Sequence, residues 1–152
     1  MENRGFKIAK GWEDKNINLP IRKTKCAAGY DFEAAEDIII PSFIKGNNPT
    51  LIPTGIKAYM QDDEVLYLYN RSSNPKKKGL VLANCVGVID KDYYENDDND
   101  GHIMFAFYNI KEEDILIKKG DAIGQGVFMK YLLADDDKAL GIRTGGFGST
   151  DK

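Results

Sequence analysis

The sequence contains few of the residues on which metal sites and histidine-dependent catalysis rely. Its two cysteines, Cys26 and Cys85, lie among apolar or small residues and form no CxxC or Cys/His cluster. This argues against a zinc site and against a disulfide framework, so we expect both to be reduced thiols. His102 is the only histidine, and no pattern supports a Ser-His-Asp or Cys-His mechanism that would have to pass through it. We assign His102 no catalytic role.

The sequence also lacks a strong excess of either charge and any long apolar run. It holds 21 basic and 24 acidic residues, a net charge of −3, unlike the electrostatic footprint of a protein that binds duplex nucleic acid. The first residues contain no hydrophobic signal core, and no stretch approaches the roughly 18 apolar residues that span a bilayer. We therefore expect a cytoplasmic protein with no nucleic-acid or membrane partner.

The chain does contain a succession of short β-like segments separated by turn residues. Its 152 residues suit one domain, residues 1–152. A helical period is hard to find, and the apolar residues alternate or run continuously. These predicted strands cover residues 6–12, 38–40, 56–60, 65–69, 103–108 and 123–133. The last two are nearly continuous apolar runs, which predicts strands buried on both faces, and Gly124 and Gly126 predict a bulge or close backbone approach. The pattern indicates an all-β barrel or sandwich.

The candidate reacting group is a single acid, Asp90. It follows an apolar, β-branched run that begins at Gly79, and two phenols, Tyr93 and Tyr94, come soon after it. A fully buried strand holds a reacting group more rigidly than a loop does, so Asp90 is a candidate base. The alternative is an ordinary turn former after a strand.

The segment that starts at Arg143 is typical of a mobile clamp for phosphate. Three glycines let backbone N–H groups converge on an anion, Ser149 and Thr150 add hydroxyl donors, and Arg143 adds a planar cation. Phe147 could stack on a flat ring, and such stacking is worth about 1–3 kcal/mol per base. A nucleotide would supply both a phosphate for the clamp and a flat ring for Phe147. The alternative is a flexible terminus with accidental glycines.

A second candidate phosphate site is Arg71-Ser72-Ser73, at the start of a helical turn expected within residues 72–78. A cation and two hydroxyls at a helix N-terminus favour an anion, although the same residues could be an ordinary helix cap. Gln125 lies between two glycines in an apolar strand. Its amide is either a structural hydrogen bonder or a neutral phosphate contact.

A polar run at residues 95–100 interrupts the β pattern with Glu, Asn and Asp. It offers oxygen ligands of the kind that a calcium loop uses, but it has neither the EF-hand spacing nor a terminal bidentate Glu. We expect a solvated hairpin tip.

These segments occur in one order, and that order resembles the trimeric dUTPase family of dUTP nucleotidohydrolases. The five matching motifs are Ala28-Gly29-Tyr30-Asp31-Phe32, Arg71-Ser72-Ser73, Asn84 through Tyr93, Gly120-Asp121-Ala122-Ile123-Gly124-Gln125, and Gly145-Gly146-Phe147-Gly148-Ser149-Thr150. One such motif is a weak signal, whereas five in sequence between about residue 25 and the C-terminus are specific.

The resemblance implies a jelly-roll-like β-barrel subunit in a threefold homotrimer whose active sites take residues from all three chains. It implies hydrolysis of dUTP to dUMP and pyrophosphate by a water that Asp90 orients toward the α-phosphorus. Backbone groups of the third-motif hairpin would accept uracil, and Tyr93 would pack against the deoxyribose and leave no room for a 2′-hydroxyl. Mg²⁺ would be held chiefly by the triphosphate, with Asp31 touching it only through water.

The resemblance also implies a mobile C-terminal tail, residues 142–152, that covers the bound nucleotide. Phe147 would cover the base, and Ser149 and Thr150 would cover the γ-phosphate. The full set of residues expected to bind substrate is Arg71, Ser72, Ser73, Asn84, Gly87, Val88, Ile89, Tyr93, Gln125, Arg143, Phe147, Gly148, Ser149 and Thr150.

The chain departs from the family pattern in three places. After Tyr93 the family places one residue and then Gly, whereas here the acidic run precedes Gly101 as though about six residues were inserted. A longer tip could alter base recognition or contact a protein partner. Asn70 stands where Pro or Gly usually precedes the Arg, and Arg143 lies one residue closer to the glycine pair than is usual.

Two alternative functions stay open at this point. A dCTP deaminase resembles this family in fold and in the Arg-Ser-Ser segment, but deamination needs a base at the pyrimidine C4, and no Glu lies in a matching late segment. The other alternative is a dUTPase scaffold that acts as a nucleotide-gated regulator and binds a protein through the 95–100 loop.

Overall fold

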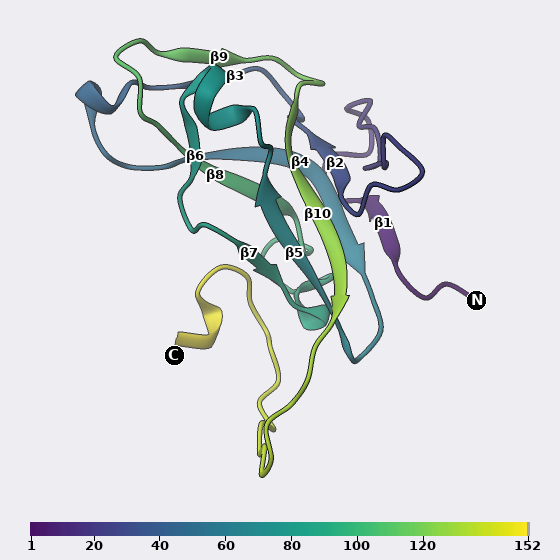
Figure 1. The fold of residues 1–152 in the computed structure, drawn as a ribbon. Helices are drawn as coiled ribbons and strands as arrows, with labels where there is room; N and C mark the ends of the chain where they lie inside the picture. Colours follow the sequence, from purple (N-terminus) through teal and green to yellow (C-terminus); the bar gives the residue numbers. More distant parts are fainter. Residues whose placement is uncertain (152) are drawn as a thin grey trace.

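The computed structural model describes residues 1–151, and antiparallel β-sheet dominates its regular structure (Figure 1). This confirms the predicted all-β class. The strands are β1 (Gly5–Ile8), β2 (Tyr30–Glu33), β3 (Ile38–Ile40), β4 (Thr50–Tyr59), β5 (Glu64–Asn70), β6 (Leu80–Leu82), β7 (Gly87–Ile89), β8 (Ile103–Asn109), β9 (Ile115–Ile117) and β10 (Ala122–Lys130). The short helical segments are η1 (Phe43–Lys45), η2 (Asn74–Lys78), η3 (Lys91–Tyr93) and η4 (Ser149–Asp151).

Two four-stranded sheets enclose the core. One has the order β1-β4-β8-β6, the other has the order β2-β10-β5-β7, and β3 and β9 form a separate pair. Phe32 and Leu66 of the second sheet are completely buried, as are Ile52 and Phe107 of the first. The ring centroids of Phe32 and Phe105 lie 5.5 Å apart across the two sheets. Side chains from both inner faces therefore fill one shared core, as in a β-sandwich.

The predicted late strands are present, but their burial differs from the expectation. Burial alternates along β8, so the prediction that this strand is buried on both faces was wrong. β10 ends at Lys130, and Leu132 beyond it is almost fully exposed. The predicted bulge is confirmed between Ala122 and Gly124. A Cβ at Gly124 would lie 2.2 Å from the Phe105 ring, so packing between the sheets requires glycine there.

The predicted single buried strand leading to Asp90 is wrong. The run divides into β6, which pairs with β8 in one sheet, and β7, which pairs with β5 in the other. The residues between them turn through Cys85, whose φ is +62°. Both sheets accept apolar strands, so the apolar pattern alone does not reveal where the chain crosses between them. As a result Asp90 follows a short edge strand and its side chain is 52% exposed.

The expected helical turn is η2, with Pro75 in its first turn. Ser73 is its N-cap residue, but its hydroxyl makes no cap hydrogen bond. Both cysteines are free and exposed. Within residues 1–151, the structure has no helix that is long and apolar enough to cross a membrane.

His102 has a structural role at the junction of β8 and β4. Its Nε2 accepts a hydrogen bond of 2.9 Å from the Gly55 N–H, and its ring centroid lies 5.2 Å from that of Trp12. Burial lowers the pKa of His102 to about 4. The folded protein therefore keeps this imidazole neutral, because protonation would remove the acceptor.

We expect the stability of the protein to fall between pH 7 and pH 5. The unfolded chain takes up a proton on His102 below about pH 6.5, whereas the folded chain does so only near pH 4. Integrated over that range, the difference costs about 2 kcal/mol of unfolding free energy by pH 5. Urea denaturation at both pH values should show this extra loss in the wild type and not in His102→Gln, whose amide oxygen can still accept the bond. Equal losses would contradict this explanation.

Candidate active site

Asp90 lines a small pocket that the hairpin and the tail form together. The residue lies between β7 and η3, and the pocket measures about 180 Å³. The hairpin contributes Asp90 and its neighbours, and the tail closes the other side, as Figure 1 shows where the yellow C-terminal segment turns back toward β7. The lining residues are Val88, Ile89, Asp90, Tyr93, Arg143, Gly146, Phe147, Gly148 and Thr150.

Tyr93 presents its ring to this pocket while its hydroxyl is fixed behind it. The side chain is buried, and burial raises the pKa of the phenol. The hydroxyl donates to the backbone carbonyl of His102 at 2.6 Å and accepts from Asn99 Nδ2 at 2.8 Å. The Phe147 ring of the tail meets the Tyr93 ring edge-on, with centroids 6.5 Å apart. The two aromatic rings therefore form one apolar corner of the pocket.

Arg143 joins the tail to the acids of the hairpin. Its Nη2 lies 3.0 Å from Asp90 Oδ2, and its Nε lies 2.8 Å from Asp92 Oδ1. The guanidinium is largely buried and lies 5.9 Å from the centre of the Tyr93 ring. In this structure the predicted phosphate-binding cation thus neutralises the predicted base.

The run at residues 95–100 is not the solvated tip that we expected. Asn96 is buried, and its Nδ2 donates to the Tyr93 carbonyl at 2.7 Å. The run also contacts the tail, because Asp98 Oδ2 accepts the Gly146 N–H at 2.8 Å. Among residues 1–151 no group of three or more His, Cys, Asp or Glu side chains could hold a metal ion.

The other predicted phosphate residues lie at the opposite end of β5. Leu66 in β5 pairs with Ile89, which precedes Asp90, whereas Arg71 comes directly after the last residue of β5. Five residues of extended strand separate these points, which is about 17 Å. Within one chain, Arg71 and its neighbours therefore do not reach the Asp90 pocket.

The hydrogen bonds of Asn70 show why an amide fits at this position, where the family usually has Pro or Gly. Its Nδ2 donates to the Leu80 carbonyl at 3.0 Å, and its Oδ1 accepts from the Arg71 N–H and from Asn74 Nδ2, both at 2.8 Å. Asn74 is buried and also donates to the Ile123 carbonyl at 2.9 Å. The amide network ties the segment that carries Arg71 to β6 and β10.

Several polar groups at this end of the sheet keep free bonding capacity. One N–H of Arg71 donates to a backbone carbonyl of β10 at 3.3 Å, and its other guanidinium donors have no partner among residues 1–151. Gln125 Nε2 donates to the Asn70 carbonyl at 3.1 Å, which is the structural role that we considered for it. Within residues 1–151 the hydroxyls of Ser72 and Ser73 make no hydrogen bond that would prevent them from binding an anion.

Asp31 lies on the same side of the sheet as Arg71. It pairs with Gln125 across β2 and β10, and with Glu33 it lines a pocket of about 440 Å³. Its carboxylate accepts no hydrogen bond from any side chain or backbone group of residues 1–151. A half-buried carboxylate that lines an open pocket and has no partner among residues 1–151 suits contact with a hydrated Mg²⁺ ion.

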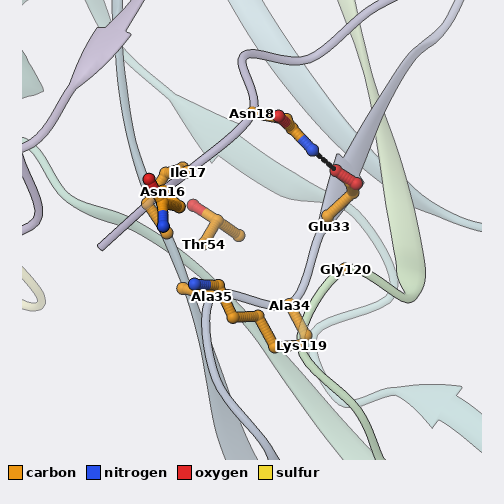
Figure 2. Close-up of a pocket in the computed structure, with 9 residues that line it drawn as sticks. All are labelled: Asn16, Ile17, Asn18, Glu33, Ala34, Ala35, Thr54, Lys119 and Gly120. Carbon is orange, nitrogen blue, oxygen red and sulfur yellow. Dashed lines mark hydrogen bonds between the residues drawn. The ribbon is translucent and has the colours of Figure 1, made fainter. Parts of the chain in front are cut away.

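A neighbouring pocket of about 240 Å³ is shown in Figure 2. It contains Thr54, Lys119 and Gly120 and is bordered by a 2.9 Å hydrogen bond from Asn18 Nδ2 to Glu33 Oε1. None of its lining residues borders the Asp90 pocket, so we do not assign it to the reaction.

Besides the residues near Arg71, three members of the predicted set do not line the Asp90 pocket, namely Asn84, Gly87 and Ser149. The Ser149 hydroxyl instead donates to the Gly145 carbonyl at 3.0 Å. Asn84 is exposed in the turn between β6 and β7. Gly87 is buried, and a Cβ there would lie 2.9 Å from Leu68, so packing against β5 accounts for this glycine.

The supporting partners of the pocket were not among the predicted site residues; they are Asp92, Gly146, Asp98 and Asn99. Gly146 was visible as part of the glycine pair, and Asp92 as a second acid close to Asp90. The hydrogen bond between Asp98 and Gly146 joins residues 48 positions apart, so no local sequence pattern predicts it.

Comparison with known proteins gives one consistent match. A family model described as dUTPase matches residues 15–150. The deoxyuridine 5′-triphosphate nucleotidohydrolase of Lactococcus lactis subsp. lactis is 55% identical over 152 residues, which cover 99% of each chain. The crystal structure of dUTPase from Streptococcus mutans has 50% sequence identity and a TM-score of 0.80, covering 86% of this chain and 98% of that one. A mutant dUTPase from phage phi11 of S. aureus, described as coordinating a structural Mg(II) ion, shares the fold with a TM-score of 0.67 and 19% identity, covering 92% of this chain and 98% of that one.

The amide network behind Arg71 can be tested by replacing Asn74 with Ala. The substitution leaves the buried Ile123 carbonyl without its donor and removes one donor from Asn70, so we expect a loss of about 1–3 kcal/mol in unfolding free energy. Urea denaturation measures this loss, with Lys76→Ala in the exposed part of η2 as the control. A loss no larger than that of the control would mean that the network does not stabilise this segment.

Proposed function

The chain belongs to the dUTPase family and is a dUTP nucleotidohydrolase, and we propose that a water oriented by Asp90 attacks the α-phosphorus of dUTP. The products are dUMP and pyrophosphate. The observation that carries this assignment is the pocket in which Asp90, Tyr93 and the tail meet. Asp90 supplies one partly exposed carboxylate that can act as a general base. The aromatic rings of Tyr93 and Phe147 beside it supply a surface for a nucleoside.

The edge position of β7 supports recognition of uracil by the backbone. β7 pairs with β5 on one side and is the last strand of its sheet. The N–H and C=O groups on its other edge have no strand partner within residues 1–151, so they can bind the donor and acceptor groups of a nucleobase. Uracil and cytosine present different hydrogen-bond donors and acceptors to this strand edge. A backbone held in one position can therefore bind uracil and reject cytosine.

Tyr93 and Phe147 are the residues that we propose for the nucleoside. The Tyr93 hydroxyl is held by two hydrogen bonds, so its ring cannot withdraw from the pocket to admit a 2′-hydroxyl. Phe147 is exposed and extends from the tail above the same space, where it can cover the base.

We propose that Arg143 exchanges its carboxylate partners for phosphate when dUTP binds. A guanidinium binds a carboxylate and a phosphate with similar geometry. While Arg143 is paired with Asp90, the carboxylate oxygen nearest to it is not free to orient water. Transfer of the cation to the triphosphate would release that oxygen in the same step that binds the substrate.

We infer that each active site of a homotrimer combines residues of neighbouring chains. Arg71 and its neighbours lie about 17 Å along β5 from the position of Asp90, too far to bind phosphates of a nucleotide whose α-phosphorus lies at Asp90 in the same chain. A second chain can instead supply Arg71, Ser72, Ser73 and Gln125. All three chains would contribute to each site, as the resemblance to the family implies.

Exposed apolar side chains support such an assembly. Val81 and Tyr108 are neighbours across β6 and β8, and Ile39 and Leu116 are neighbours across β3 and β9. All four are more than one-third exposed, as is Leu51. Apolar surface of this kind is typical of subunit contacts.

A magnesium ion fits the phosphate half of the proposed site. Bound Mg²⁺ would neutralise charge on the phosphate oxygens during the attack. Asp31 would hold the ion through water, because its carboxylate lines the pocket on the Arg71 side of the sheet and has no partner in residues 1–151. The two halves would then place a base near the α-phosphorus and positive charge near the outer phosphates.

The deaminase alternative is not favoured. The family model and the 55% identical relative are both dUTP nucleotidohydrolases, and the Asp90 pocket contains no Glu.

Replacing Asp90 with Asn should lower kcat by about 10³-fold, because an amide cannot accept the proton of the attacking water. The measurement is pyrophosphate release from dUTP, with dCTP, dTTP and UTP as comparison substrates for the wild type. Unchanged turnover in Asp90→Asn, or comparable wild-type rates on all four nucleotides, would refute the assignment.

Mixed trimers test whether the site is shared. Asp90→Asn and Arg71→Ala should each be nearly inactive alone. If neighbouring chains supply the two halves, unfolding and refolding an equal mixture should restore about one quarter of the wild-type activity, because one in four random neighbour pairs carries both intact residues. A mixture as inactive as its components would place both residues in one chain's site, and the same proteins mixed without unfolding serve as the control.

A further inference from the structure

We propose that Asn70 is a positioning residue of the nucleotidohydrolase reaction, which holds Arg71 and Gln125 in place to bind the outer phosphates of the substrate. This inference rests on the proposed function, because the phosphate role of Arg71 and Gln125 is part of it. Asn70 stands where the family usually has Pro or Gly, and neither of those residues has a side chain that could form the hydrogen bonds described below.

The side chain of Asn70 fixes the backbone at Arg71. β5 ends at Asn70, and its Oδ1 accepts the Arg71 N–H at 2.8 Å. The Nδ2 of the same amide donates to the carbonyl of Leu80 at 3.0 Å, and Leu80 is the first residue of β6 in the other sheet. The amide that holds the Arg71 backbone is therefore itself anchored to the opposite sheet.

The guanidinium of Arg71 is fixed at the β10 bulge. Arg71 Nη1 donates to the Ala122 carbonyl at 3.3 Å, and Asn74 Nδ2 donates to the adjacent Ile123 carbonyl at 2.9 Å. Asn74 Nδ2 also donates to Asn70 Oδ1 at 2.8 Å. Both ends of Arg71 are thus held by the network, so little side-chain entropy remains to be lost when its free donors bind an anion.

The backbone carbonyl of Asn70 positions Gln125. Gln125 Nε2 donates to this carbonyl at 3.1 Å, and a Cβ at Gly29 would lie 2.2 Å from Gln125 Oε1. The bond on one side and the close approach to Gly29 on the other leave the amide one direction. Its second N–H has no partner among residues 1–151 and can bind a phosphate oxygen.

A neutral amide suits this position better than a carboxylate does. Asn70 Oδ1 accepts two hydrogen bonds while Nδ2 donates a third, so both halves of the amide are used. A carboxylate could not donate to the Leu80 carbonyl, and its charge would repel the phosphates. Asn therefore supplies the acceptor for the Arg71 N–H without adding negative charge beside the substrate.

Two ligands separate phosphate binding from nucleoside binding. An α,β-imido analogue of dUTP carries all three phosphates and resists hydrolysis, whereas dUMP lacks the outer two. Calorimetric titration of the full-length protein in the presence of Mg²⁺ gives a Kd for each ligand. The ratio of the dUMP Kd to the analogue Kd, here called the phosphate ratio, reports on the outer-phosphate contacts. A general loss of stability or of the nucleoside pocket weakens both ligands and leaves this ratio unchanged.

Three variants remove different parts of the proposed arrangement. Arg71→Ala removes a phosphate contact itself and so provides the reference. Asn70→Ala removes the side-chain bonds that hold Arg71. Gly29→Ala leaves Asn70 intact but places a methyl group where the Gln125 amide lies, so it displaces that amide from the Asn70 carbonyl.

Asn109→Ala is the matched control. Asn109 is a buried amide whose Nδ2 donates to the Ile40 carbonyl at 3.1 Å and whose Oδ1 accepts the Lys111 N–H at 2.9 Å. It therefore loses hydrogen bonds of the same kind as Asn70 does. Its side chain is bonded to none of the proposed phosphate residues, so its loss lowers stability alone.

We expect Asn70→Ala to lower the phosphate ratio by about tenfold, the factor that corresponds to loss of a hydrogen bond to a charged group. Gly29→Ala should lower it in the same direction, and Asn109→Ala should stay within twofold of the wild type. If Asn70→Ala does not fold, Gly29→Ala decides, because a ratio within twofold of the wild type would then contradict the role of the Asn70 carbonyl.

The reference variant distinguishes failure of this inference from failure of the proposed function. An unchanged ratio in Asn70→Ala together with a lowered ratio in Arg71→Ala would overturn the positioning role and leave the phosphate role of Arg71 intact. Equal decreases in Asn70→Ala and Asn109→Ala would show a merely structural effect and would also overturn it. An unchanged ratio in Arg71→Ala would refute the proposed phosphate role of Arg71, and the inference would fall with it.

Discussion

The pairing of β7 with β5 is the constraint on which the arrangement of the active site depends. It places Asp90 at the open edge of one sheet, where a nucleobase can bind the backbone groups that have no strand partner in residues 1–151. It also separates Asp90 from Arg71, because the two residues lie near opposite ends of the extended β5. Because the extended β5 keeps these two residues apart, the proposal that one substrate meets both of them requires a second chain.

A second set of contacts connects the barrel to the tail. It begins at Lys57, continues through residues 95–100, and ends at Tyr93 and at Gly146. The tail alone could not bury enough apolar surface to hold a position. In this structure the hydrogen bond from the Gly146 N–H to Asp98 and the ion pairs of Arg143 with Asp90 and Asp92 fix that position.

The sequence predicted the fold class and the order of the functional segments well. β-branched alternation identified most strands, and the interruption at Gly124 marked a bulge. The crossing between the sheets was missed because Leu80–Leu82 and Gly87–Ile89 are equally apolar and the turn at Cys85 carries no glycine. Asp90 was found because it follows a strand, but its exposure was misjudged for the same reason.

The contacts in the site that join segments far apart in the chain could not be predicted from the sequence. The amide at Asn70 looked like a departure from the family pattern, whereas the structure shows it bonding three segments together. The acidic run looked like a solvated tip, because its partners Lys57 and Gly146 lie about 40 and 50 residues away. Such pairings depend on which strands are neighbours, and that is decided by the whole fold.

The central claim is that one substrate is held by Asp90 of one chain and by Arg71 of another. A crystal structure of the assembly with a non-hydrolysable dUTP analogue and Mg²⁺ tests it most directly. The account predicts that the α-phosphate lies beside Asp90 of one chain, while the outer phosphates contact Arg71 of a neighbour. An analogue bound by Asp90 and Arg71 of the same chain would contradict it.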